Sequence, residues 1–337
     1  MITKFQTVHN KSVNQLDQWK YTKVVTDNRK TKSVYRFRLQ PTDNGTNSEC
    51  SYTEHWNHEK PPELRISISR PDCFGRSELD QINEFQKEIG KVHLALLRAP
   101  GFPQFFIEEG ILETIDIYYD HKVNDLVEDY INAMSHLKYP FRKTAFRRNN
   151  DVAYVEFDVK TTFLNLYRLS GVSESSGILR QLKSFQNTES IARAMNLEKP
   201  TLLDVTPEWI TSELQRDIEK LGISEFPMCD QTQVMNMLMN TYPSGVESTL
   251  WELLLAYQTM TKDQVAIELN IHPSEVGHML KAINATGCAL AFSEGIELPP
   301  LKVQLKTCEE EVQNLEVIVK KIRTAPERRL FYPSYGY

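Results

Sequence analysis

The sequence predicts an α+β domain, in which helices cover one face of an antiparallel sheet, followed by an all-helical region. Three observations lead to this prediction. Stretches that alternate apolar and polar residues, the pattern of half-buried strands, recur as far as residue 185, with amphipathic helical stretches between them. Beyond residue 187 apolar residues recur every three or four positions, as in helices that pack on one side. Two of these late helices are separated by a short turn, which predicts a helix-turn-helix-like pair.

The composition is that of an ordinary soluble globular protein, with 337 residues, of which 40% are hydrophobic and 25% charged. The chain has no long apolar run and no stretch of signal-peptide type at its start, so we expect a cytoplasmic protein with no membrane partner. Five scattered cysteines without a CxxC arrangement argue against a disulfide framework or a thiolate zinc site. The net charge of -6 means that any contact with nucleic acid must rest on local basic patches.

The first part of the chain predicts strands and two helices between them. Ser77 is a candidate N-cap for the first helix, which runs to Leu97, and the second helix extends from about Lys122 to Leu137. Apolar and polar residues alternate in the expected strands, which are 33–40, 63–69, 110–120, 151–158, 161–168 and 177–185.

The segment 41–62 is rich in turn-forming residues and predicts an exposed loop. It contains His55 and His58, a spacing that can bind a metal ion. We favour two solvated histidines, because no helix or strand is expected there to fix the pair.

The strand at 110–120 places Asp116, Tyr118 and Asp120 on one face, because side chains alternate across a strand. Two carboxylates on one face can hold a divalent cation through oxygen ligands. Alternatively, Asp120 caps the following helix and Asp116 faces solvent.

A basic run between His136 and Asn150 contains aromatic residues and no acidic ones. Such residues can neutralise phosphates and stack on unpaired bases, although a solvated basic connection explains them equally well. The candidate DNA-binding residues of this run are Lys138, Arg142, Lys143, Arg147 and Arg148.

The strand pair that follows brings carboxylates and a tyrosine together. A hairpin near residue 160 would place Glu156 and Asp158 close to the second strand, on which Asn165 and Tyr167 share a face. Periodicity alone gives Tyr167 no special role, because a tyrosine in a strand usually packs against its neighbours.

The segment 260–288 has helix-turn-helix spacing, the arrangement that can place a second helix in the major groove of DNA. Its outward candidates are Ser274, Glu275, His278 and Lys281, and a purely structural helical pair is an equally good interpretation. The predicted domains are an α+β domain over 1–198, a helical domain over 199–300, and a C-terminal helix with an aromatic tail over 301–337.

The order of several stretches resembles the rolling-circle replication initiators of filamentous phages and related plasmids, the gene II and gene X type, in a divergent form. The stretch ETIDIYYDHKV is similar to the family's Arg-Ile-Asp strand, and FLNLYRLSGVSES resembles its Tyr-Asp-Lys-x-x-Glu motif. The stretch SGILRQLKSF is similar to its Leu-Arg-x-Glu strand, and ISISRPDCFGRSEL to its strand with a Leu-Pro-Lys turn.

This resemblance implies a nicking-type domain whose tyrosine attacks origin DNA with help from Mg²⁺ or Mn²⁺. Tyr167 matches the motif tyrosine, Arg168 stands near the position of a phosphate-steadying lysine, and Arg180 falls in the later strand motif as a further DNA contact. The partners implied are double- and single-stranded origin DNA and a replication helicase or polymerase of a bacterial host. The carboxylates that could serve as metal ligands are Asp116, Asp120, Glu156 and Glu174.

Two departures from the family pattern keep a second hypothesis open. Val172 and Leu182 stand where the family has acidic residues. The chain could therefore be a catalytically degenerate initiator or regulator that binds DNA with the same scaffold and the helix-turn-helix. The acidic net charge suggests a third possibility, an interaction protein without a role at DNA.

Overall fold

The computed structural model describes residues 2–304 except 12, 14–19, 26–30, 40–44, 56–60, 70–77, 99–101, 104, 136, 138–142, 150–151, 160 and 170–176. The chain forms one compact unit over Met1–Val303, and Gln304–Tyr337 forms a second unit. The predicted C-terminal helix and aromatic tail lie outside the described residues.

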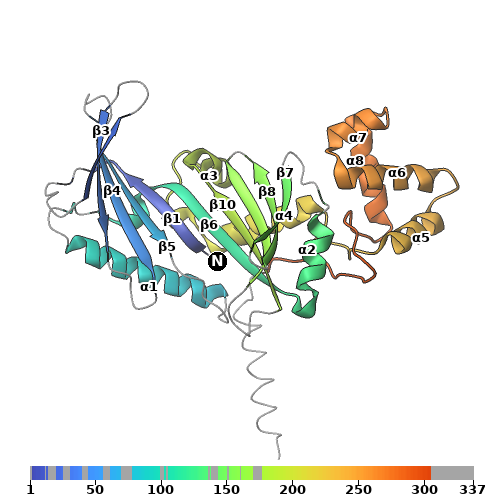
Figure 1. Ribbon diagram of the computed structural model, residues 1–337, viewed down its shortest axis with the longest axis horizontal. Helices are drawn as coiled ribbons and strands as arrows, with labels where there is room; N and C mark the ends of the chain where they lie inside the picture. The colour runs from blue at the N-terminus through green and yellow to red at the C-terminus, as the bar shows by residue number, and fades with distance from the viewer. Residues whose placement is uncertain are drawn as a thin grey trace, which may run out of the picture. The chain divides into compact units, whose positions relative to one another are not determined.

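A ten-stranded antiparallel sheet in the order β2-β3-β4-β5-β1-β6-β10-β9-β8-β7 forms the centre of the first unit (Figure 1). Strands β1 and β6 lie side by side in the middle, and four further strands follow outward on each side. The strands are β1 (Ile2–His9), β2 (Lys20–Val25), β3 (Thr31–Arg38), β4 (Asn47–His55), β5 (Glu63–Ser69), β6 (Ile111–Lys122), β7 (Lys143–Asn149), β8 (Val152–Val159), β9 (Thr162–Arg168) and β10 (Ile178–Phe185).

The predicted α+β class is confirmed, since helices accompany this sheet and dominate the chain after β10. Single-turn helices occur at Ile107–Glu109, Asn124–Leu126 and Leu202–Asp204. The α-helices are α1 (Glu78–Leu97), α2 (Val127–Ser135), α3 (Thr188–Met195), α4 (Pro207–Leu221), α5 (Gln231–Thr241), α6 (Val246–Thr259), α7 (Lys262–Glu268) and α8 (Pro273–Ala285).

The predicted loop over 41–62 is wrong for its central part, which forms strand β4. Cys50 and Tyr52 of this strand are 0% and 3% exposed, and they pair with Ile66 and Leu64 of β5. The turn-forming composition misled the prediction because β4 is held between two neighbouring strands, and tertiary context overrides weak strand propensity. The side chain of His55 and all of His58 lie outside the described residues.

Helices α1, α2 and α4 pack on the same face of the sheet. Phe85 of α1 meets Phe5 edge-to-face, with ring centroids 5.6 Å apart. Gln181 of β10 donates a hydrogen bond to the Leu214 carbonyl of α4 at 2.9 Å. The α2 helix is joined to the same face by an ion pair between Glu128 and Arg168 of β9, with 3.5 Å between nitrogen and oxygen. The apolar side chains of this face supply the core of the sheet.

The α4 helix is fixed to the sheet by a buried ionic cluster. The ammonium of Lys183 lies 2.9 Å from carboxylate oxygens of both Glu213 and Asp217, and all three side chains are at most 5% exposed. Upstream of α4, the carbonyl of Pro200 accepts a hydrogen bond from the backbone N–H of Leu112 in β6. The predicted domain boundary after residue 198 assigned α4 to the helical region, whereas its contacts attach it to the sheet.

The last four helices, α5 to α8, share one hydrophobic core. Val265 and Ala266 of α7 are buried in it, and so are Val276 and Ile283 of α8. Asn270, in the turn between the two helices, has a left-handed backbone with φ of 51°. The buried apolar positions of both helices therefore pack into the same core. None of the helices that the structure describes is both long and apolar enough to cross a membrane.

Candidate functional site

The candidate site lies on the sheet face opposite α1, α2 and α4, which we call the polar face. Its character follows from the strand register, because directly paired residues on neighbouring antiparallel strands project to the same side. The polar face carries the following charged, hydroxyl and amide side chains of the middle strands: Lys4, Gln6, Ser67, Ser69, Asp116, Tyr118, Asp120, Glu156, Asn165, Tyr167, Arg180 and Ser184.

One row across the polar face contains Asp120, Arg180 and Tyr167 on the adjacent strands β6, β10 and β9. The Arg180 guanidinium donates from Nε and Nη2 to the two oxygens of Asp120 at 2.7 and 2.8 Å. It also stacks over the ring of Tyr118, with its central carbon 4.0 Å from the ring centroid. The Arg180 side chain is 0% exposed and that of Asp120 is 18% exposed. Arg180, predicted as a DNA contact, is therefore enclosed in this structure, with its Nε and Nη2 donors directed at Asp120.

Asp116 lies two residues along β6 from Tyr118 and is paired with Lys4 on one side and Ser184 on the other. Burial raises the pKa of its carboxyl, while a hydrogen bond with Ser184 and the positive charge of Lys4 act in the opposite direction. Burial therefore makes the Asp116 carboxyl easier to protonate than an exposed aspartate.

Tyr167 is half-buried and pairs with Arg180 of β10 and Tyr154 of β8. Glu156 pairs with Asn165, which places the glutamate diagonally across from Tyr167 on the same face. Diagonal neighbours of this kind are about 7–8 Å apart at their Cα atoms, within reach of long side chains. The structure thus brings the predicted tyrosine and one predicted carboxylate together.

Arg168 does not share the face of Tyr167. Successive side chains of a strand alternate, and Arg168 forms its ion pair with Glu128 of α2 on the helix-covered face. The structure therefore does not bring Arg168 together with Tyr167 on the polar face. Neighbours in the sequence of a strand lie on opposite sides of the sheet.

The predicted metal ligands do not make up a complete donor set. Among the residues that the structure describes, no group of three or more histidine, cysteine, aspartate and glutamate side chains is arranged to hold a metal ion. Asp120 uses both carboxylate oxygens for Arg180. Glu174 lies outside the described residues, which leaves Asp116 and Glu156 on the polar face.

The basic run is only partly described. Lys138 and Arg142 lie outside the described residues, whereas Lys143, Arg147 and Arg148 belong to the edge strand β7. The structure describes the backbone of these three residues, and Arg147 pairs with Tyr154 in the row that contains Tyr167. The run is therefore a strand beside the candidate site, where the sequence had suggested a connecting segment.

The outward positions of α8 are exposed as expected. Ser274, His278 and Lys281 all face solvent. The first of them takes part in the helix cap, because its backbone N–H donates to Nδ1 of His272. Glu275 closes the same cap by accepting a hydrogen bond from the backbone N–H of His272 at 3.0 Å.

Sequence reasoning missed several residues of the polar face. Lys4 and Ser184 were not predicted to belong to the site, whereas Asn165 was expected on the face of Tyr167. Asn165 carries a buried side-chain oxygen that has no hydrogen-bond partner among the residues that the structure describes. The available signal was strand alternation, which shows that residues share a face but not which strands are neighbours.

Comparisons with known proteins add no family. No family model and no curated protein matches the chain. Among solved structures, the 12:0-ACP thioesterase from Umbellularia californica is 11% identical over 55% of this chain and 74% of that chain, with a TM-score of 0.18. DynU16, from the dynemicin biosynthetic locus, is 10% identical over 55% and 76%, with a TM-score of 0.18. The di-domain ARO/CYC StfQ, from the steffimycin biosynthetic pathway, is 8% identical over 65% and 85%, with a TM-score of 0.20. These TM-scores are too low to carry an argument.

Proposed function

We propose that this chain initiates rolling-circle DNA replication by nicking one strand of origin DNA through Tyr167. The observation that carries the proposal is the placement of Tyr167 beside the Asp120–Arg180 pair, with Glu156 and Asp116 on the same polar face. The order of sequence motifs supports it independently. Origin DNA, double- and single-stranded, would be the substrate, and a host helicase or polymerase would act next at the opened strand.

The chemistry requires an activated phenol. A tyrosine hydroxyl with an ordinary pKa near 10 is a weak nucleophile until a base takes its proton. Glu156, diagonally placed, is the best base candidate among the described carboxylates, because Asp120 is engaged by Arg180. The phenolate oxygen attacks phosphorus, and the bond to the 3′ oxygen breaks. That oxygen takes up a proton to become a free 3′-hydroxyl, and the 5′-phosphate stays on Tyr167.

The divalent cation expected from the sequence has no complete ligand set among the described residues, and the step above does not involve it. The effect of a divalent cation is measured by running the adduct assay described next with Mg²⁺, with Mn²⁺ and with a chelator.

The decisive experiment looks for a covalent protein–DNA adduct. The full chain is incubated with single-stranded and supercoiled origin DNA from its own replicon, and adducts are detected on denaturing gels. The proposal expects an adduct that is lost in Tyr167→Phe and kept in the control Tyr119→Phe, whose tyrosine lies on the helix-covered face of β6. An adduct that persists in Tyr167→Phe would assign the nucleophile elsewhere.

A second candidate function is a DNA-binding initiator or regulator without catalysis. It is favoured by the mutual neutralisation of Asp120 and Arg180, which leaves the Asp120 carboxylate engaged. In that case DNA binds without any adduct, and the exposed α8 residues His278 and Lys281 contribute to binding through the helix-turn-helix-like pair. Loss of affinity in Lys281→Ala, with no adduct under any metal condition, would support this alternative.

A further inference from the structure

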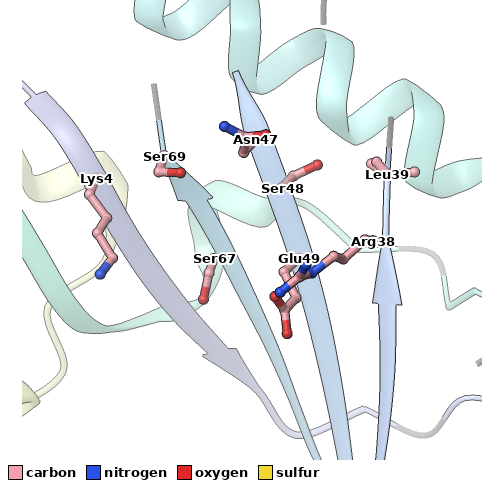
Figure 2. Close-up of a pocket in the computed structure, with 8 residues that line it drawn as sticks. All are labelled: Lys4, Arg38, Leu39, Asn47, Ser48, Glu49, Ser67 and Ser69. Carbon is pink, nitrogen blue, oxygen red and sulfur yellow. The ribbon is translucent and has the colours of Figure 1, made fainter. Parts of the chain in front are cut away.

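The polar face continues from Asp116 into an open pocket on the other half of the sheet. The pocket has a volume of about 610 Å³ and lies over β1, β5, β4 and the end of β3 (Figure 2). Its polar lining residues are Lys4, Arg38, Asn47, Ser48, Glu49, Ser67 and Ser69. None of the site residues predicted from the sequence lines this pocket.

Strand register explains how these side chains meet. Lys4 of β1, Ser69 of β5 and Asn47 of β4 form one row, and Ser67, Glu49 and Arg38 belong to the next. Lys4 also pairs with Asp116 of β6, so it stands between the pocket and the candidate site. The pocket and the tyrosine row therefore share one continuous face of the sheet.

The pocket has an excess of positive charge. Its single acidic residue, Glu49, already accepts a hydrogen bond from Nε of Arg38 at 2.9 Å, and Nε of Arg36 lies 3.9 Å from it. Lys4 is exposed, and no hydrogen bond or salt bridge joins its ammonium to another residue in the described part of the chain. Its charge acts on Asp116, whose burial favours the neutral acid. The lining thus has two cations, Lys4 and Arg38, and one carboxylate, that of Glu49.

Two of the other lining groups can donate hydrogen bonds to an anion. The Ser69 hydroxyl and the Asn47 amide lie in the same row as Lys4, and the amide has a second N–H besides the one that it donates to the Gly45 carbonyl. The Ser67 hydroxyl, in the row beside it, already donates to the side-chain oxygen of Gln6. Cationic nitrogens surrounded by hydroxyl and amide donors bind the oxygens of a phosphate group. The low number of apolar side chains in the lining argues against an apolar ligand.

We propose that this pocket binds a phosphate of the single DNA strand that also reaches Tyr167; the inference rests on the proposed function. In the sheet order, β1 lies three strands away from β9, and β4 lies five strands away. At about 4.8 Å per step the strand would run roughly 14–24 Å across the sheet. This distance corresponds to roughly four to seven nucleotides at the rise of duplex DNA. The pocket therefore holds the strand away from the nick.

The test measures binding of a single-stranded thymidine oligonucleotide to the full chain at several salt concentrations. Lys4→Gln and Ser69→Ala are each expected to weaken binding about three- to tenfold. The slope of log affinity against log salt should fall by about 0.7 in Lys4→Gln, because one phosphate contact and its counterion release are lost. It should not change in Ser69→Ala, which removes no charge. The matched control is Arg193→Gln on α3, whose side chain is 76% exposed and should alter neither quantity.

Wild-type affinity in both pocket variants would overturn the proposal, and so would an equal loss in the Arg193 control. Inorganic phosphate provides a second ligand. If phosphate binding depends on Lys4 while oligonucleotide binding does not, the pocket takes a free anion and the strand path is wrong. The adduct assay is independent of these results. Adduct formation with unaltered affinities rejects only the pocket, whereas altered affinities without an adduct reject only the nicking step.

Discussion

The ion pair between Asp120 and Arg180 gives the sharpest prediction about stability. Replacing Arg180 by Met leaves the Asp120 carboxylate, 18% exposed, without the two hydrogen bonds it accepts at 2.7 and 2.8 Å. Removing one partner of a buried pair costs about 3–5 kcal/mol in the free energy of unfolding. Because water can still reach part of the Asp120 carboxylate, Arg180→Met should lower the free energy of unfolding by about 3 kcal/mol. Asp120→Asn should lower it by about 5 kcal/mol, because the guanidinium that remains is 0% exposed.

The double variant decides whether the pair itself is responsible. The double variant Arg180→Met/Asp120→Asn leaves no unpaired buried charge. Its loss in the free energy of unfolding should therefore be smaller than the sum of the two single losses by about 1–3 kcal/mol. Urea unfolding at neutral pH measures all four free energies. Additive costs, to within about 0.5 kcal/mol, would refute the reasoning. The exposed pair of Arg193 and Glu189 is the control, and its removal should change stability by less than about 0.5 kcal/mol.

Three further predictions concern buried groups. Burial lowers the pKa of His121 to about 4, so the folded chain binds fewer protons than the unfolded one between about pH 6.5 and 4. Stability should fall as pH drops through this window, by about 3 kcal/mol in all from this group, and unfolding of His121→Asn should show a shallower dependence. Gly110→Ala should destabilise by about 1–3 kcal/mol, because the new Cβ would overlap the ring of His9, whereas Gly90→Ala meets nothing within 4 Å and should not destabilise. Lys183→Met should cost about 3–5 kcal/mol in urea unfolding, because the carboxylate of Asp217, 0% exposed, loses the ammonium beside it, while Glu213 keeps its ion pair with Arg216; an unchanged midpoint would contradict this.

Strand alternation predicted much of the α+β part because it is a local property. The strand Glu63–Ser69 and the helix that ends at Leu97 have the predicted bounds, and the alternation of β6 placed Asp116 and Asp120 on one face. The strand β4 was missed, since its polar composition is compatible with a loop and its burial comes from neighbours distant in the chain. Local propensity carries no information about such neighbours.

The sequence by itself determined the α+β class, the helical spacing of α7 and α8, and Tyr167 as a residue that shares a face with Asn165. Only the tertiary structure decided that Arg180 is enclosed against Asp120 and Tyr118, that Arg168 lies on the opposite face, and that Lys4 adjoins Asp116. The physical reason is that the side-chain period of a strand fixes which residues share a face. The order and register of strands depend on pairing between segments more than 100 residues apart, such as Lys4 and Asp116.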